Sequence, residues 1–254
     1  MSENRVSRRA MVLLVLLALC AVADGACDTR STTAPASILL FTGTGTSSGD
    51  VAALEAILNA NHLDYATASS AELTAMADEG LGRYRLLIVP GGNFVEIGDR
   101  LTPRTIANVR RGVQNGLNYL GICAGAFLAG SLPPPYKSLN LTSGVQFGFY
   151  AAGRDVRRAV VAIARPDGPT LDQYWEDGPQ LAGWGSVVAK YPDGTPAVVQ
   201  GTFGGGWVVL TGIHPEATER WRRGLAFSTP ASTDHAFAAT LIHAALSRTS
   251  LAHF

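Results

Sequence analysis

The fold is decided by the stretch Gly116-Leu117-Asn118-Tyr119-Leu120-Gly121-Ile122-Cys123-Ala124-Gly125-Ala126-Phe127. Its first half is a short apolar run that is typical of a buried strand. Its second half is expected to begin a helix near Ala124. Glycines two residues before and after Cys123 let the chain turn sharply between the two. A cysteine on such a turn is held away from the backbone, so the pattern predicts an exposed nucleophile. Taken alone, the turn also fits a small buried cysteine.

Working outward, apolar runs alternate with stretches of helical spacing. Strands are expected at 38–41, 63–68, 86–89 and 117–122, and helices at 50–61 and 102–115. Buried strands that alternate with helices predict a parallel sheet covered on both faces.

After Pro133 the pattern changes to strands separated by turns. Further strands are expected at 145–151, 159–164, 187–189, 197–203 and 207–210, with hairpins at Asp193-Gly194 and 204–206 and a last helix from 233 to 246. We therefore predict one α/β domain, residues 38–249, with a flavodoxin-like, mostly parallel sheet and antiparallel strands in its C-terminal half.

Three features fall at strand ends, where open α/β sheets form their sites. The helix after Cys123 favours a thiolate, and the Ala124 N–H is a candidate oxyanion donor. Gly91 and Gly92 follow the strand 86–89 and let backbone amides approach a ligand, so the Gly92 N–H is a second candidate oxyanion donor. His214 and Glu216 follow the strand 207–210 and are the candidate base and its orienting partner. Together they predict a cysteine-dependent catalytic site.

A glycine- and threonine-rich loop follows the first strand, and Gly43, Thr44 and Gly45 are candidate residues for holding an anionic group through their amides. A simple helix-capping loop is the alternative. Three aromatic residues either line a ligand site or pack in the core: Tyr174, Trp175 and Trp184. The histidines apart from His214 lack ligand spacing, so no metal site is expected.

At these residues the sequence resembles the class I glutamine amidotransferase-like superfamily, and within it the N-terminal domain of biotin-protein ligases in its free-standing bacterial form. The resemblance is carried by 87–92, by the cysteine stretch, by 174–179, by 191–194 and by 212–216. It implies a Cys-His-Glu triad of Cys123, His214 and Glu216 on a flavodoxin-like sheet, without a cofactor. The glycine- and arginine-rich biotin-binding loop of ligases is absent, so biotinylation is not expected.

The sequence leaves three functions open. The first is an exported cysteine-dependent hydrolase acting on a small-molecule or peptide amide. The second is a non-catalytic ligand-binding or scaffold lipoprotein that keeps the triad geometry, and the third is a redox-sensing thiol. The chain has 20 basic and 20 acidic residues, so no nucleic-acid partner is expected.

The first 27 residues predict a signal peptide, followed by a linker at 28–37. Arg5, Arg8 and Arg9 precede an uncharged run from Ala10 to Ala23, which is too short for a membrane span. Ser7 to Val12 also resembles a twin-arginine export signal. Cleavage after Ala23 and lipidation of Cys27 remain alternatives, and a lipid would be the only attachment to a membrane. The mature protein is then periplasmic, secreted or lipid-anchored in a bacterium.

Overall fold

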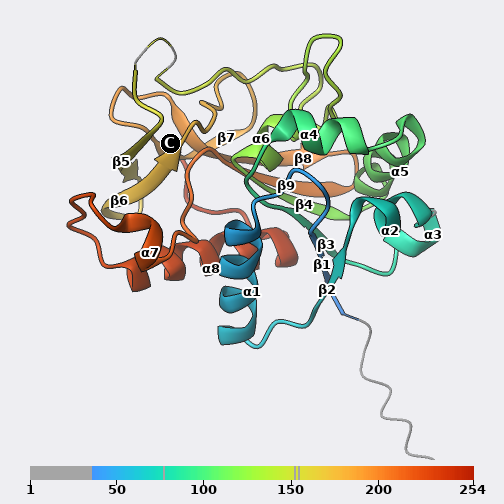
Figure 1. Cartoon of the computed structure of the whole chain (residues 1–254), viewed down its shortest axis with the longest axis horizontal. Helices are drawn as coiled ribbons and strands as arrows, with labels where there is room; N and C mark the ends of the chain where they lie inside the picture. Colours follow the sequence, from blue (N-terminus) through green and yellow to red (C-terminus); the bar gives the residue numbers. More distant parts are fainter. Residues whose placement is uncertain (1–35, 77, 152, 154) are drawn as a thin grey trace, which may run out of the picture. The chain divides into compact units, whose positions relative to one another are not determined.

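A computed structural model describes residues 36–254 except 77, 152 and 154. Ala34–Phe254 forms one compact unit. Its elements are β1 Ile38–Phe41, α1 Ser48–Ala60, β2 Tyr65–Ala68, α2 Ser70–Ala75, α3 Asp78–Leu81, β3 Leu86–Val89, α4 Phe94–Arg100, α5 Pro103–Gln114, β4 Asn118–Ile122, α6 Ala124–Ala129, β5 Arg158–Arg165, β6 Gly168–Glu176, β7 Ser186–Lys190, β8 Pro196–Phe203, β9 Gly206–Thr211, α7 Glu219–Arg222 and α8 Ala231–Ser247 (Figure 1).

The strands form one sheet in the order β2-β1-β3-β4-β9-β8-β7-β5-β6. The pairs from β2 to β9 are parallel, and those from β9 to β6 are antiparallel. β9 therefore joins the two halves. This mixed α/β sheet confirms the predicted fold class.

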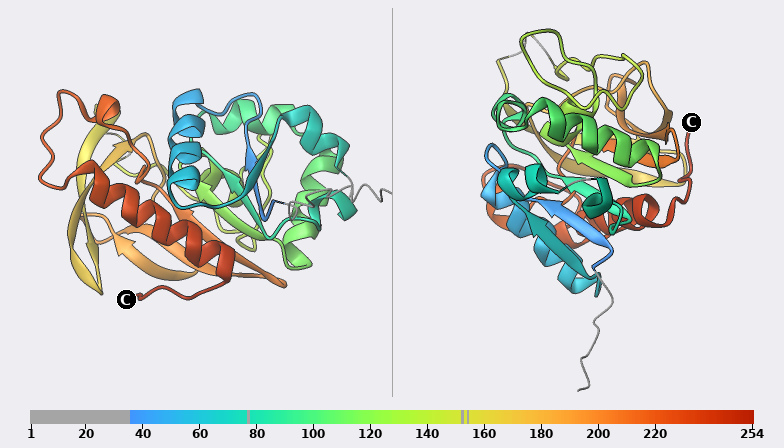
Figure 2. Two further views of the ribbon diagram at one scale, coloured as in Figure 1. Left: turned by 90° about the horizontal axis from the view of Figure 1, so that it is seen from below. Right: turned by 90° about the vertical axis from the view of Figure 1, so that its right-hand side faces the viewer.

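The central strands are apolar on both sides because helices cover both faces. In β1, Ile38 and Leu40 pack with α1 and α8, whereas Leu39 and Phe41 pack with the helices of the other face. Figure 2 shows α8 crossing one face of the sheet with α1 beside it. The carboxyl ends of β1, β3, β4 and β9 consequently meet at one edge, which is where the predicted site residues lie.

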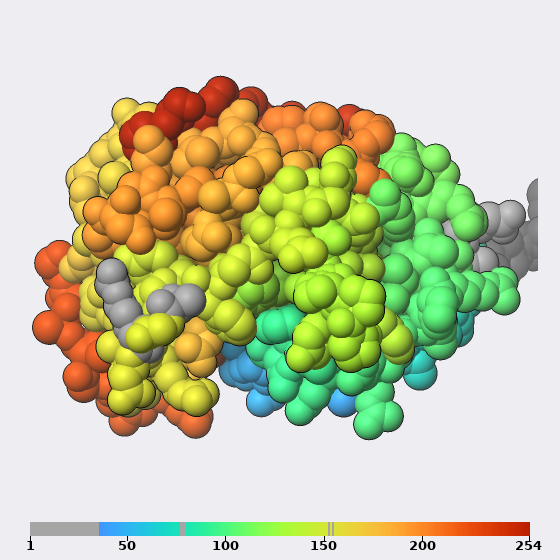
Figure 3. All heavy atoms as spheres, turned by 90° about the horizontal axis from the view of Figure 1, so that it is seen from above, coloured from blue at the N-terminus to red at the C-terminus, as the bar shows by residue number. Residues whose placement is uncertain are grey.

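The C-terminal half departs from the prediction in two places. Residues 145–151 do not form a strand: their pairing is limited to one isolated antiparallel bridge between Phe149 and Pro179. They belong to the long connection from α6 to β5, whose surface is yellow-green in Figure 3. β6 was missed because its buried Gln173, which binds Asp234, interrupts the apolar pattern.

The predicted signal peptide, the alternatives for Cys27 and nearly all of the linker lie outside the described residues. Within the described residues, no helix is both long and apolar enough to cross a membrane.

We expect Gly125→Ala to destabilise the fold by about 3 kcal/mol, because its Cβ would lie 2.1 Å from the Val89 carbonyl oxygen, a backbone atom of the neighbouring strand. Urea denaturation measures the change. Gly148→Ala is the matched control, since its Cβ would meet no atom closer than 3.6 Å, and it should change stability by less than about 0.5 kcal/mol. Equal stability of the two variants would contradict the close approach of α6 to β3.

Candidate functional site

The turn at Cys123 has the strained backbone of a strand-to-helix nucleophile turn. Cys123 has φ 48° and ψ −101°, a region that non-glycine residues rarely adopt. Small neighbours are required, because a Cβ on Gly121 would lie 2.6 Å from the backbone of Gly125. The sequence reasoning about these two glycines therefore has a direct steric basis.

The expectation of an exposed cysteine is wrong. Cys123 is only 6% exposed, because β6 and the segment after it lie across the turn. Its thiol donates a weak hydrogen bond to the Glu176 carbonyl oxygen, with 3.6 Å between Sγ and O. It borders a cavity of about 480 Å³, which we call the cysteine cavity, together with His214 and Gly92. The thiol is thus reached through this cavity and not from the open surface.

His214 follows β9 and is buried. Its Nδ1 donates a hydrogen bond to Glu216 Oε1 over 2.9 Å, and Glu216 is fully buried. The pairing inferred from their spacing is therefore present in the structure. Since Nδ1 is held by the carboxylate, Nε2 is the ring nitrogen left to exchange protons.

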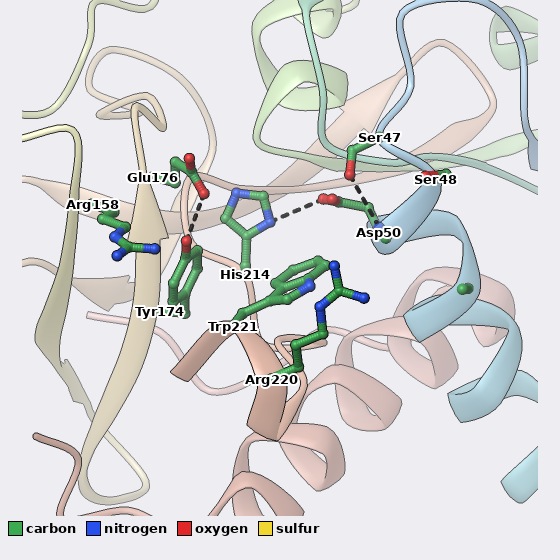
Figure 4. Close-up of a pocket in the computed structure, with 11 residues that line it drawn as sticks. Ser47, Ser48, Asp50, Arg158, Tyr174, Glu176, His214, Arg220 and Trp221 are labelled. Atoms are coloured by element: carbon green, nitrogen blue, oxygen red, sulfur yellow. Dashed lines mark hydrogen bonds and ion pairs between the residues drawn. The ribbon is translucent and has the colours of Figure 1, made fainter. Parts of the chain in front are cut away.

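A second carboxylate, which the sequence reasoning missed, faces the same nitrogen. Asp50 Oδ1 lies 3.1 Å from His214 Nδ1 as an ion pair, and both side chains are 6% exposed (Figure 4). Asp50 lies in the first turn of α1, where its N–H donates to Ser47 Oγ. The signal in the sequence is an acidic residue just after the first strand, at the edge where the other strands end.

Gly91 is needed by this pair. A Cβ there would lie 2.1 Å from Asp50 Oδ1 and 2.7 Å from His214 Cε1. Gly91 does not line the cysteine cavity, whereas Gly92 does. The glycine at 91 therefore lets the backbone pass beside the ion pair.

The buried charges in this group influence one another. Burial alone would lower the pKa of His214, but the charges of Cys123, Glu216 and Asp50 hold that pKa well above 6.5. Burial would raise the pKa of Asp50, yet His214 and Ser47 bring it below its usual 3.8. Burial raises the pKa of Glu216 above 4.5 despite His214. Asp50 therefore ionises at a lower pH than Glu216 does.

The two candidate oxyanion donors, Gly92 and Ala124, stand on neighbouring strand ends. Gly92 has φ +140°. It is bridged to Thr46, and the two hydrogen bonds of this bridge are donated by the Ser47 and Asn93 amides, so the Gly92 amide takes no part in them. Ala124 directly follows the cysteine at the start of α6. Neither amide donates to another backbone oxygen among the described residues. Both donors remain predictions.

A second cavity, of about 590 Å³, also borders His214. Neither this cavity nor the cysteine cavity is bordered by the loop residues Gly43, Thr44 and Gly45. Thr44 N donates to Ser70 Oγ, and the Gly45 carbonyl accepts from Asn93 N. Ser47, two residues further on, caps α1 and borders both cavities. A ligand-binding role for 43–45 remains a prediction.

The segment 174–176 at the end of β6 connects the two sides of the site. The His214 N–H donates to the Tyr174 carbonyl, and the Tyr174 hydroxyl donates to Glu176 Oε2 over 2.6 Å. Of the predicted aromatic wall, Tyr174 borders the second cavity, whereas Trp175 is a core residue.

Among the described residues, the group able to hold a metal ion is Asp50, His214 and Glu216, whose ligand atoms all lie within 4.8 Å of one another. Both carboxylates approach the single nitrogen Nδ1: Glu216 Oε1 is hydrogen-bonded to it, and Asp50 Oδ1 faces it as an ion pair without a hydrogen bond of its own. The arrangement therefore suits an oriented imidazole.

Comparison with known families matches residues 36–132 to the model described as "Biotin-protein ligase, N terminal". This segment runs from β1 through α6, so it contains Asp50 and Cys123 and ends before His214. A comparison with curated protein sequences gave no significant match.

Solved structures share the fold of the described domain. A glutamine amidotransferase is 22% identical, with a TM-score of 0.57, 72% of this chain and 92% of that chain being covered. PurLQS from Thermotoga maritima is 17% identical, with a TM-score of 0.54 and coverage of 81% and 97%. An exo-beta-1,4-mannosidase from an Opitutaceae bacterium is 15% identical, with a TM-score of 0.52 and coverage of 82% and 36%.

The described domain thus has the glutamine amidotransferase-like fold. Within it, residues 36–132 match the biotin-protein ligase N-terminal model. The resemblance predicted from the sequence is confirmed at this level.

We expect Asp50→Asn and Glu216→Gln each to lower the pKa of His214, because both carboxylates face Nδ1 and hold that pKa up. Titration of the His214 Cε1–H signal by NMR measures this pKa in both variants. The raised pKa of His214 stabilises the fold fully below pH 6.5, and this contribution is lost as the pH rises through the folded pKa. Asp50→Asn should therefore cost more stability at pH 6 than at high pH. An unchanged His214 pKa in either variant would contradict this assignment.

Proposed function

We propose that this protein is an exported cysteine-dependent amide hydrolase with Cys123 as nucleophile and His214 as base. The observation that carries the proposal is that Cys123 and His214 border one cavity, while two buried carboxylates hold the opposite nitrogen of the histidine. A thiol nucleophile requires a base, and the base requires an orienting partner.

In the first half of the reaction, His214 Nε2 takes the thiol proton and Sγ attacks the amide carbonyl carbon. The C–S bond forms as the carbonyl π electrons move onto oxygen, and the N–H groups of Gly92 and Ala124 stabilise that oxyanion. The intermediate collapses, the C–N bond breaks, and the leaving amine takes the proton from His214.

In the second half, His214 removes a proton from water, and the resulting hydroxide attacks the thioester carbonyl. The C–S bond breaks and the carboxylic acid is released, with the proton returning to the thiolate. Asp50 and Glu216 stabilise the imidazolium that forms in each half and keep the ring oriented.

The cysteine cavity favours an apolar group on the substrate. Phe94 and Phe127 stack with ring centroids 4.7 Å apart, and Phe149 lies 4.8 Å from Phe127. All three border the cavity, and Phe149 is 45% exposed at its edge. Such a wall binds an apolar substrate group through burial and aromatic contact.

Export belongs to the proposal and rests on the charge pattern of residues 1–27. Ammonia transfer to a synthetase is not proposed, because an exported protein has no ATP-driven partner beside it. Intact mass measurement of the mature protein, made in a bacterium with its signal intact, distinguishes cleavage after Ala23 from lipidation at Cys27.

We expect a fluorescent iodoacetamide to label Cys123 in the native protein, with labelling lost in Cys123→Ala. His214→Asn should slow labelling at pH 7 by at least about tenfold, which corresponds to ~1.4 kcal/mol. His235→Asn, which removes a half-buried histidine on α8, is the matched control and should leave the rate unchanged. Turnover is then sought by incubating wild type and Cys123→Ala with a metabolite extract and following loss of amides by mass spectrometry. Equal labelling rates in the wild type, His214→Asn and His235→Asn would contradict the role of His214.

A second function is a binding protein that keeps this geometry without turnover. It is favoured by the thiol's hydrogen bond to the Glu176 carbonyl, which turns Sγ toward β6. A metabolite that co-purifies equally with wild type and Cys123→Ser, with no amide consumed by either, would support it.

A further inference from the structure

The second cavity, of about 590 Å³, lies on the other side of His214 from the nucleophile. It shares Ser47, Asp50, Glu176 and His214 with the cysteine cavity, so the two are adjacent along one wall. We call it the arginine cavity, because Arg158 of β5 and Arg220 of α7 line it (Figure 4). A ligand that reaches Cys123 can therefore extend past His214 into this space.

The two arginines are not neutralised within the cavity. Neither forms an ion pair with a carboxylate among the described residues. The two acids on the shared wall already have other partners: Asp50 faces His214, and Glu176 accepts the Tyr174 hydroxyl. The cavity thus offers two guanidinium groups to an anion.

The wall that carries Arg220 is held by a buried ion pair. Arg222 Nη1 lies 3.2 Å from Asp234 Oδ2 of α8, with side chains 5% and 1% exposed, and Gln173 of β6 binds the same aspartate. Arg222 also donates to the Thr229 carbonyl. These contacts fix α7 against β6 and α8. Trp221, next to Arg220, packs against Tyr174 and His214 as a further part of the wall.

The first turn of α1 also borders the cavity. Within the described part of the chain, the amides of Ser48 and Gly49 in this turn donate to no backbone oxygen. Helix N-termini favour negative charge, and here the effect reinforces that of the arginines.

We propose that the arginine cavity binds a carboxylate of the substrate whose amide is attacked by Cys123. This inference rests on the proposed function and defines its substrate class: amides that carry a carboxylate a few bonds from the scissile bond. Arg158 and Arg220 bind that carboxylate from β5 and α7, while the aromatic wall receives the other end of the molecule. Acidic amides and peptides with a free carboxyl terminus belong to this class.

The test uses alkylating probes, because alkylation of Cys123 does not require turnover. The probes are chloroacetyl-glycine, chloroacetyl-β-alanine and chloroacetyl-6-aminohexanoate, each paired with its uncharged methyl amide. The rate of Cys123 modification is followed by mass spectrometry as a function of probe concentration.

We expect at least one carboxylate probe to react about tenfold faster than its methyl amide, the effect of one charged hydrogen bond. The difference should lie in the half-saturating concentration and should shrink as salt is raised. Arg220→Gln and Arg158→Gln should each bring the ratio of the paired rates toward one. Arg223→Gln is the matched control, since Arg223 is exposed beside α7 and does not line the cavity, and the ratio should persist there.

Equal rates for acid and amide at all three lengths, or a preference that survives both arginine substitutions, would overturn the proposal. Failure of the proposed function gives a different result. If no amide is consumed but the carboxylate preference depends on Arg158 and Arg220, the anion site stands and the hydrolase does not. If amides are consumed without such a preference, the hydrolase stands and the anion site does not.

Discussion

The site depends on one constraint, the placement of His214 Nδ1 against two buried carboxylates. Glu216 reaches Nδ1 from the same loop after β9, and Asp50 reaches it from the first turn of α1. A buried ionic group of this kind is stable only when each charge has a partner. The beginning of α1, the glycine turn after β3 and the loop after β9 must therefore meet within a few ångströms. Position 91 requires glycine, because a side chain there would collide with Asp50 and His214.

The same edge of the sheet has two separate surfaces on either side of His214. The cysteine cavity is bordered by phenylalanines and by the strained turn of Cys123. The arginine cavity is polar and carries two guanidinium groups that form no ion pair with a carboxylate of the described residues. β6 and α7 form the outer walls. Both belong to the part of the chain after the segment that matches the biotin-protein ligase N-terminal model. The matched segment thus provides Cys123, and the remainder of the domain shapes the cavities beside it.

Fold relatives range from a glutamine amidotransferase to an exo-beta-1,4-mannosidase. A fold shared by such differently named proteins does not specify a reaction, so the chemistry has to be argued from the side chains at the site. In this chain the distinguishing side chains are the buried Asp50, His214 and Glu216 beside Cys123, together with Arg158 and Arg220 of the second cavity.

The sequence by itself determined the parallel half of the sheet, because its apolar runs and glycine turns are local signals: β3, β4 and the turn at Cys123 follow from them. The pairing of His214 with Glu216 could also be predicted, since the two are neighbours in the chain. Only the tertiary structure decided the burial of Cys123, the contact of Asp50 with His214, and the meeting of Arg158 with Arg220 around one cavity. β6 escaped prediction because its buried Gln173 is satisfied by Asp234, 61 residues away. These features depend on contacts between segments that are distant in the chain, so a local pattern of polar and apolar residues cannot predict them.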